Sequence, residues 1–284
     1  MSLSSVSRSL GRGLLALTLV NLALPVFAER PPDPLRHSEA PVGPRGGTYR
    51  VFLPPGYPDA APYPTVYFLH DFFGDSGILW RQGVIARVRA EMAAGRMPLL
   101  VLVAPDGGKG FWADFHDGRR RFETWLRDGL PTEVEARFAV RRDRDGRAFA
   151  GISMGGYAAA RFALKTPELL RAAGSLSGAL VPFDWAFVRS APLPQRWNLK
   201  RIFGGSETQN NLAANDLVRL LEASGGDPAA QRAGGGAMPR LLLHSGTEDK
   251  YRLDEAAHKF GERARAAGFE VELVLEPGTH SWRF

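Results

Sequence analysis

The residues with the clearest chemical signature form a Gly-x-Ser-x-Gly pentapeptide at 151–155, centred on Ser153. The apolar run at 148–152 predicts a buried strand, and the Ala-rich run at 154–166 predicts a helix that stops at Pro167. A serine between such a strand and helix lies in a strained turn, and flanking glycines remove side chains that would clash there. Its hydroxyl would lie at the N-terminus of the helix, whose dipole favours a developing oxyanion. We therefore predict that Ser153 is a nucleophile.

A serine hydroxyl is a weak nucleophile until a base takes its proton. Three histidines follow Ser153 in the chain, namely His244, His258 and His280. His280 lies in a glycine-containing loop after the last predicted strand, where the base of a Ser–acid–His order belongs. His244 ends an apolar strand and can pack there, and His258 lies within a predicted helix. We therefore predict His280 as the base.

The acid that orients the base should follow the strand before, in the Ser-Gly-Thr-Glu-Asp loop at 245–249. This loop offers two carboxylates, and we predict Asp249 as the acid with Glu248 as the alternative. A competing interpretation is that Asp249 only caps the following helix, a role that aspartate fills well.

Two backbone amides must stabilise the oxyanion. One should be Met154, directly after the nucleophile, and the other Phe72, in the loop that follows the strand at 64–69. Neighbouring loops carry the side chains that we predict to bind substrate: His70, Asp71, Trp112 and Trp185.

Strands alternating with helices, most of the strands continuously apolar, predict a mostly parallel sheet covered by helices on both faces. Together with the serine pentapeptide and the Ser–acid–His order, this predicts an α/β-hydrolase fold. We expect the strands at 48–53 (an edge strand), 64–69 (interior), 98–104, 148–152, 170–176, 241–244 and 269–275. We expect the helices at 79–97, 122–138 (kinked or split at 129–131), 154–166, 215–223 and 251–267. Such sheets bind ligands at the carboxyl ends of their strands, so the predicted site residues should gather at one edge.

Residues 178–212 interrupt this alternation with several prolines and aromatic side chains. A long irregular segment of this kind is often a lid or a wall of a substrate site, although it can also be a plain surface excursion.

The N-terminal residues 1–28 combine two arginines, an apolar stretch and a small-residue end at Ala28, which predicts a cleavable signal peptide. Residues 29–47 form a Pro-rich linker, and 48–284 form the catalytic domain. We therefore expect a secreted or periplasmic protein with no stable membrane span after cleavage.

Composition excludes several classes of site. The 284 residues contain no cysteine, so disulfides and thiolate metal sites are unavailable. We find no metal-ligand cluster, dinucleotide fingerprint or phosphate loop, and predict no cofactor and no metal. The formal charge of +6 comes from arginines dispersed among acids, and without a nucleic-acid motif we expect no nucleic-acid partner.

The chain resembles the esterase D-like family of esterases over almost all of 48–282. The matching motifs are Tyr-Phe-Leu-His at 67–70, Pro-Asp-Gly-Gly at 105–108, Gly-Ile-Ser-Met-Gly-Gly at 151–156, Ser-Leu-Ser-Gly at 175–178, Gly-Thr-Glu-Asp at 246–249 and Gly-Thr-His-Ser-Trp at 278–282. The family includes S-formylglutathione hydrolases, feruloyl and acetyl-xylan esterases and mycolyltransferases. The resemblance implies Ser153 as nucleophile, Asp249 as acid and His280 as base.

Two departures from the family bear on the site. Asp71 stands where relatives usually have glycine, and we expect its side chain to alter the oxyanion loop or its charge. The printed sequence ends four residues after His280, where relatives continue into a helix, and we expect less support for the His280 loop.

These features predict an exported serine carboxylesterase that cleaves a small-molecule or carbohydrate-linked ester through an acyl-enzyme. An envelope acyltransferase with the same triad is the first alternative. A non-catalytic envelope-binding protein on a hydrolase scaffold is the second. The acyl group, the alcohol and the oligomeric state stay open.

Overall fold

The computed structural model describes residues 37–40, 47–206, 210–224 and 238–282. The predicted signal peptide and most of the predicted linker lie outside the described residues.

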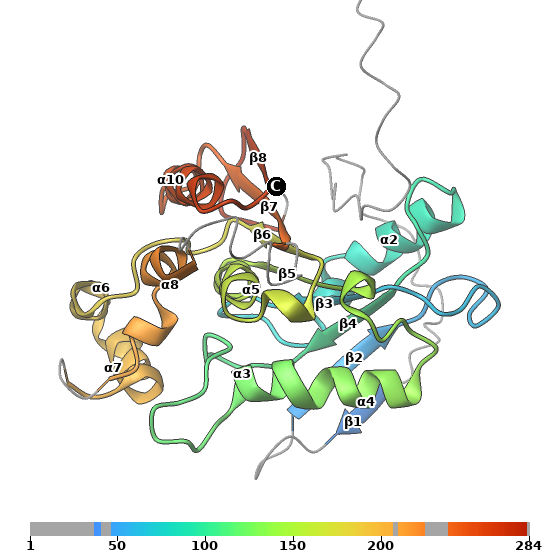
Figure 1. Cartoon of the computed structure of the whole chain (residues 1–284), viewed down its shortest axis with the longest axis horizontal. Helices are drawn as coiled ribbons and strands as arrows, with labels where there is room; N and C mark the ends of the chain where they lie inside the picture. The colour runs from blue at the N-terminus through green and yellow to red at the C-terminus, as the bar shows by residue number, and fades with distance from the viewer. Residues whose placement is uncertain (1–36, 41–46, 207–209, 225–237, 283–284) are drawn as a thin grey trace, which may run out of the picture.

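Eight strands form one sheet in the order β1-β2-β4-β3-β5-β6-β7-β8 (Figure 1). Only β2 runs against its neighbours, pairing antiparallel with β1 and β4, while all other pairs are parallel. The strands are β1 (His37–Ala40), β2 (Gly47–Phe52), β3 (Thr65–Leu69), β4 (Val101–Pro105), β5 (Arg147–Ile152), β6 (Ala172–Leu176), β7 (Arg240–Gly246) and β8 (Val271–Glu276). The predicted α/β-hydrolase fold class is confirmed.

Helices cover both faces of this sheet. The α-helices are α1 (Ile78–Arg81), α2 (Val84–Ala93), α3 (Phe122–Thr124), α4 (Leu130–Arg137), α5 (Met154–Lys165), α6 (Trp185–Ser190), α7 (Leu193–Phe203), α8 (Leu217–Ser224) and α10 (Leu253–Ala266). Shorter turns are the π-helical η2 (Trp125–Gly129) and the 3₁₀ turns η3 (Arg144–Gly146), η4 (Pro167–Leu169) and η5 (Ala213–Asn215). None of these helices in the described part of the chain is long and apolar enough to cross a membrane.

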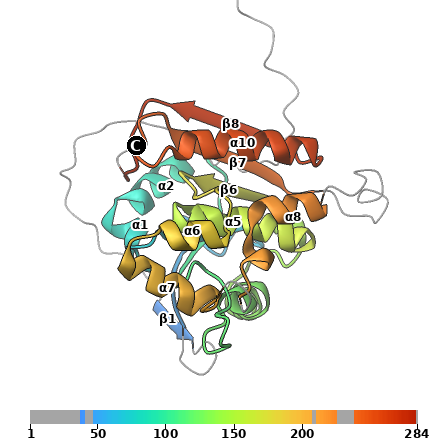
Figure 2. The ribbon, with the colours of Figure 1, turned by 90° about the vertical axis from the view of Figure 1, so that its left-hand side faces the viewer.

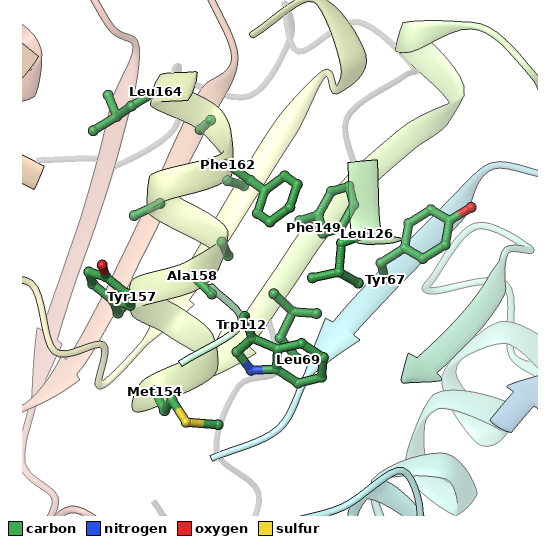
Figure 3. Packing of buried hydrophobic residues seen from close by; sticks show 14 of the residues in the cluster. Tyr67, Leu69, Trp112, Leu126, Phe149, Met154, Tyr157, Ala158, Phe162 and Leu164 are labelled. Carbon is green, nitrogen blue, oxygen red and sulfur yellow. The ribbon is translucent and has the colours of Figure 1, made fainter. Parts of the chain in front are cut away.

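Alternation along the strands explains the two layers. Val66 and Phe68 of β3 point into one apolar cluster, which contains the buried side chains of α1 and α2. Tyr67 and Leu69, at the positions between, join the larger cluster under α5. Figure 3 shows the rings of Tyr67, Phe149 and Phe162 in this second layer, with centroids 5.0 and 4.9 Å apart along the row. Both faces of the interior strands are therefore buried, as their continuous apolar composition predicts.

An additional strand and a divided helix differ from the sequence predictions. The strand β1 lies within the predicted linker and pairs outside β2, so the prediction of β2 as an edge strand was wrong. The helix predicted at 79–97 is two helices, because Gly83 adopts a left-handed φ of 73° between them.

Much of the described part of residues 178–212 is helical, since α6 and α7 lie within it. A proline lies in the first turn of α7. The backbone N–H groups of a first turn have no partner within the helix, so a proline, which lacks an N–H, is tolerated there. Phe183, Val188 and Phe203 are buried in the main core. These helices lie together at the left of Figure 1 and face the viewer in Figure 2. The segment is thus a packed part of the domain.

Candidate active site

Ser153 lies in a strained turn between β5 and α5. Its φ of 55° and ψ of −112° fall in a region that non-glycine residues rarely adopt. The turn is also crowded, because a Cβ at Gly151 would lie 2.6 Å from the Leu69 carbonyl oxygen, and one at Gly155 only 1.9 Å from it. Glycine is therefore required on both sides of Ser153, as the pentapeptide predicts.

His280 contacts both of its predicted partners. Its Nε2 is 3.1 Å from the Ser153 hydroxyl oxygen, and its Nδ1 is 2.8 Å from Oδ2 of Asp249. These three residues come from the loops that follow β5, β7 and β8, three parallel strands of one half of the sheet, with β6 between β5 and β7. Their carboxyl ends lie at the same edge of the sheet. With Nδ1–H donating to the carboxylate, Nε2 is left to accept the serine proton.

The two candidate acids differ sharply in position. The Asp249 side chain is fully buried, and its Oδ1 also accepts the Tyr251 amide at 2.8 Å. Glu248 is exposed and uses its backbone N–H to hold the Gly278 carbonyl at 2.8 Å. Asp249 does not cap α10, whose N-cap is Arg252. Only Asp249 is placed to orient His280.

The loop after β3 presents the predicted oxyanion amide. The Asp71 carboxylate accepts a hydrogen bond from the Phe73 N–H at 2.8 Å, and the backbone carbonyl of Asp71 accepts one from the Gly74 N–H at 3.2 Å. The Phe72 amide has no hydrogen-bond partner among the described residues, and neither has the Met154 amide in the first turn of α5. The loop passes beside that turn, since a Cβ at Gly155 would lie 2.9 Å from the His70 carbonyl oxygen. Two free donors therefore lie near the nucleophile.

His70 and Trp112 do not fit their predicted role of binding substrate. They are 1% and 0% exposed, so a substrate has no surface to contact on either side chain. The His70 Nε2 accepts the Gly107 N–H at 3.0 Å, so Nδ1 must carry the proton that it donates to the Asp71 carbonyl at 2.6 Å. The Trp112 indole donates to the His70 carbonyl at 3.3 Å. Both side chains therefore hold the backbone of the loop after β3 from its buried side.

Asp71 is half-buried and its second carboxylate oxygen is engaged across the site. Oδ2 accepts the indole N–H of Trp282 at 2.8 Å. The sequence marked Asp71 as a departure from the family but did not reveal this partner, which lies 211 positions away in the chain.

Phe111 is a residue that the sequence did not single out for the site. Its ring contacts Phe72 of the oxyanion loop at 5.9 Å and Phe183 at 5.4 Å, and it adopts a φ of 51°. Phe183 in turn stacks on Tyr157 of α5 at 4.5 Å. The sequence signal that could have identified Phe111 is its position in the loop after the Pro-Asp-Gly-Gly motif. These rings form an aromatic bridge between the oxyanion loop and residues 178–212.

Trp185 begins α6 and is half-buried, with the Lys200 ammonium 5.7 Å from its ring. The start of the same segment reaches the nucleophile, because the Ala179 N–H donates to the Ser153 carbonyl at 3.3 Å. A role of Trp185 in substrate binding stays a prediction. Across the described ranges, no cluster of three or more histidine or acidic side chains could hold a metal ion.

Comparisons with known proteins identify relatives in sequence and in structure. Esterase Rv1288 of Mycobacterium tuberculosis is 28% identical over 246 residues, which cover 82% of this chain and 52% of that protein. The chain thus spans about half the length of this relative. A solved ferulic acid esterase superposes with a TM-score of 0.72 at 19% identity, covering 88% of this chain and 92% of the other. The Staphylococcus aureus fluorophosphonate-binding serine hydrolase FphF superposes with a TM-score of 0.67 at 19% identity, covering 87% and 91%.

These structural likenesses establish the fold. The family follows from a family model described as "Putative esterase", which matches residues 44–282 and so includes every loop of the site. The chain belongs to this esterase family.

Proposed function

We propose that this protein is a serine carboxylesterase that hydrolyses its substrate through an acyl-enzyme on Ser153. The observation that carries the proposal is the position of His280 between the Ser153 hydroxyl, at 3.1 Å, and the Asp249 carboxylate, at 2.8 Å. Membership of the esterase family and the similarity to an esterase of Mycobacterium tuberculosis support the same reaction class.

In this mechanism the Ser153 hydroxyl attacks the ester carbonyl while His280 Nε2 accepts its proton. The buried Asp249 carboxylate keeps the imidazole in the required tautomer and stabilises the imidazolium. The imidazolium then returns the proton to the leaving alcohol, and the acyl group remains on Ser153. Water, activated by the same histidine, attacks the acyl-enzyme and releases the acid.

The tetrahedral intermediates carry a negative oxygen that needs preorganised donors. The backbone amides of Phe72 and Met154 supply them, supported by the lack of other partners for these groups among the described residues. Phe72, Phe73 and Phe111 surround the oxyanion loop with aromatic surface, and Phe73 is 81% exposed. This surface favours an apolar or aryl acyl group, the class to which a feruloyl group belongs.

Export is part of the proposal and rests on residues 1–28, which carry the features of a signal peptide. Expression of the full chain in a bacterial host, followed by N-terminal sequencing of the mature protein, tests it. Processing after Ala28 supports export, and an intact N-terminus in the cytoplasmic fraction contradicts it.

The function itself is tested with p-nitrophenyl esters of increasing acyl length and with feruloylated and acetylated sugars. We expect wild-type protein to release free acid and Ser153→Ala to release none above background. Addition of a carbohydrate acceptor distinguishes the acyltransferase alternative. Predominant formation of a new ester at millimolar acceptor, seen by mass spectrometry, would replace hydrolysis with transfer as the function.

A further inference from the structure

The hydrogen bond between Asp71 and Trp282 joins two loops that the proposed reaction uses at the same moment. Asp71 precedes Phe72, whose amide is the proposed oxyanion donor, and Trp282 lies two residues after His280, the proposed base. The two loops follow β3 and β8, which are separated by three strands in the sheet. The contact therefore closes the site from opposite sides of the nucleophile.

The Asp71 carboxylate divides its two oxygens between these loops. Oδ1 accepts the Phe73 N–H at 2.8 Å and shapes the turn that presents Phe72. Oδ2 accepts the Trp282 indole N–H at 2.8 Å. Hydrogen bonds to an ionised carboxylate are about twice as strong as neutral ones, so one side chain can hold both loops.

Trp282 is also held by packing. Its ring lies 6.1 Å from Phe68 of β3 and joins the apolar cluster on the α1 and α2 face of the sheet. The indole is thus fixed in orientation, with its N–H directed at Asp71. The His280 loop is also bound to the loop that carries Asp249, because the Glu248 N–H donates to the Gly278 carbonyl at 2.8 Å.

We propose that the Asp71–Trp282 hydrogen bond is a clamp that sets the His280 loop against the oxyanion loop, with Asp71 and Trp282 as positioning residues. This inference rests on the proposed function. The clamp touches neither the Ser153–His280 pair nor the His280–Asp249 pair, and it acts by fixing the base relative to the oxyanion donors.

Asp71→Asn and Trp282→Phe break the clamp from its two ends. In Asp71→Asn the remaining oxygen can still accept the Phe73 N–H, whereas the new amide N–H₂ faces the indole N–H, and two donors cannot pair. Trp282→Phe removes the indole N–H and keeps an aromatic ring against Phe68. Because small misplacements of catalytic groups cost about one to two orders of magnitude in rate, we expect kcat to fall roughly tenfold in each variant.

Two matched substitutions control for general damage. Trp80→Phe removes a buried indole N–H that has no partner among the described residues, on the same face of the sheet. Asp75→Ala removes a carboxylate of the same loop that pairs with Arg81 at 2.8 Å and does not contact Trp282. We expect both controls to keep kcat within about twofold of wild type, the scatter expected of surface and unpaired positions.

The experiment uses these four variants and the double variant Asp71→Asn/Trp282→Phe. For each protein it measures kcat and KM for p-nitrophenyl acetate, the rate of reaction with a fluorophosphonate probe, and the melting temperature. The clamp predicts lower kcat and slower probe reaction in both single variants, KM within about twofold, and a double variant no slower than the slower single one. Multiplying effects, an effect on KM alone, or losses matched by the controls would each overturn it.

Failure of the clamp and failure of the proposed function give different results. A wild-type protein that reacts with the ester and the probe, with clamp variants equal to it, overturns the clamp and leaves the function intact. A wild-type protein that reacts with neither overturns the function, and the catalytic role of the clamp with it.

Discussion

At the scale of single residues, the site depends on which of two adjacent carboxylates faces His280. Asp249 is buried with one oxygen on His280 Nδ1 and the other on the Tyr251 amide, whereas Glu248 is exposed. The Tyr251 ring lies edge-on to the His280 ring, with centroids 5.2 Å apart, and restricts its rotation further. The contacts therefore favour Asp249 over Glu248 as the residue that orients His280 in the proposed mechanism.

We expect Asp249→Asn to lower kcat by about three to four orders of magnitude, because an amide at this position favours the wrong imidazole tautomer. Glu248→Gln is the matched control in the same loop and should change kcat by less than about twofold, since its side chain is exposed. Steady-state kinetics on p-nitrophenyl acetate measure both. A large loss in Glu248→Gln with an active Asp249→Asn would assign the acid to Glu248 instead.

The contacts of Ser153, His280 and Asp249 could be expected from residue type and place after a strand, because parallel strands bring their carboxyl ends to one edge. Their catalytic roles stay predictions. His70 and Trp112 were misjudged since nothing in the sequence distinguishes a polar side chain facing the site from one buried beneath it. The Asp71–Trp282 contact depends on tertiary packing between distant loops, which no local pattern encodes.

At the scale of elements, the β5–turn–α5 unit carries the strongest steric constraint on the sequence. We expect Gly155→Ala to lower the free energy of unfolding by about 3 kcal/mol, since its Cβ would overlap the Leu69 carbonyl oxygen at 1.9 Å and the backbone would have to move. Gly205→Ala is the control, because a Cβ there meets nothing within 4 Å. Urea unfolding of both variants provides the comparison. Equal stabilities would mean that the turn is less crowded than the structure indicates.

The helices α6 and α7 change the expectation for residues 178–212. Since Phe183 is buried at the centre of the aromatic bridge, Phe183→Ala should lower the free energy of unfolding by about 3–5 kcal/mol. Trp197→Ala, which truncates a side chain that is 71% exposed on α7, should change it by less than about 0.5 kcal/mol. Chemical unfolding tests both. A negligible effect of Phe183→Ala on the free energy of unfolding would instead favour the interpretation of residues 178–212 as a lid that is not part of the packed core.

The elements themselves were predictable in unequal measure. The interior strands and α5 were found because buried parallel strands and Ala-rich helices have strong, continuous patterns. The strand β1 was missed because a short paired strand among prolines is indistinguishable from an extended linker. The break at Gly83 and the helices α6 and α7 were missed because a single glycine or proline marks a helix boundary only in context.

At the scale of the whole molecule, a charge network around the buried Arg161 joins α5 to α3 and η5. Arg161 of α5 is fully buried, donates to the Asn215 side chain at 2.9 Å and lies 3.4 Å from Glu123. Glu123 also pairs with Lys165. Burial alone would raise the pKa of Glu123, but the positive charges of Arg161 and Lys165 outweigh it and hold this pKa below its ordinary value.

A carboxyl whose pKa is lower in the folded state stabilises the fold above its unfolded pKa, and this contribution is lost as pH falls through the folded pKa. Glu123→Gln should therefore destabilise the protein at pH 7 and differ less from wild type at about pH 3, where glutamate in the unfolded chain is largely protonated. Urea unfolding at the two pH values measures the difference. A gap between the two proteins that does not shrink on acidification would contradict this role of Glu123.

Covalent labelling with a fluorophosphonate probe tests whether Ser153 is an activated nucleophile. We expect one adduct per chain, located by peptide mass spectrometry on Ser153, with Ser153→Ala unlabelled under the same conditions. His280→Ala should slow labelling strongly, since the hydroxyl then has no base. Equal labelling of Ser153→Ala, or an adduct on another residue in wild type, would show that Ser153 is not the nucleophile.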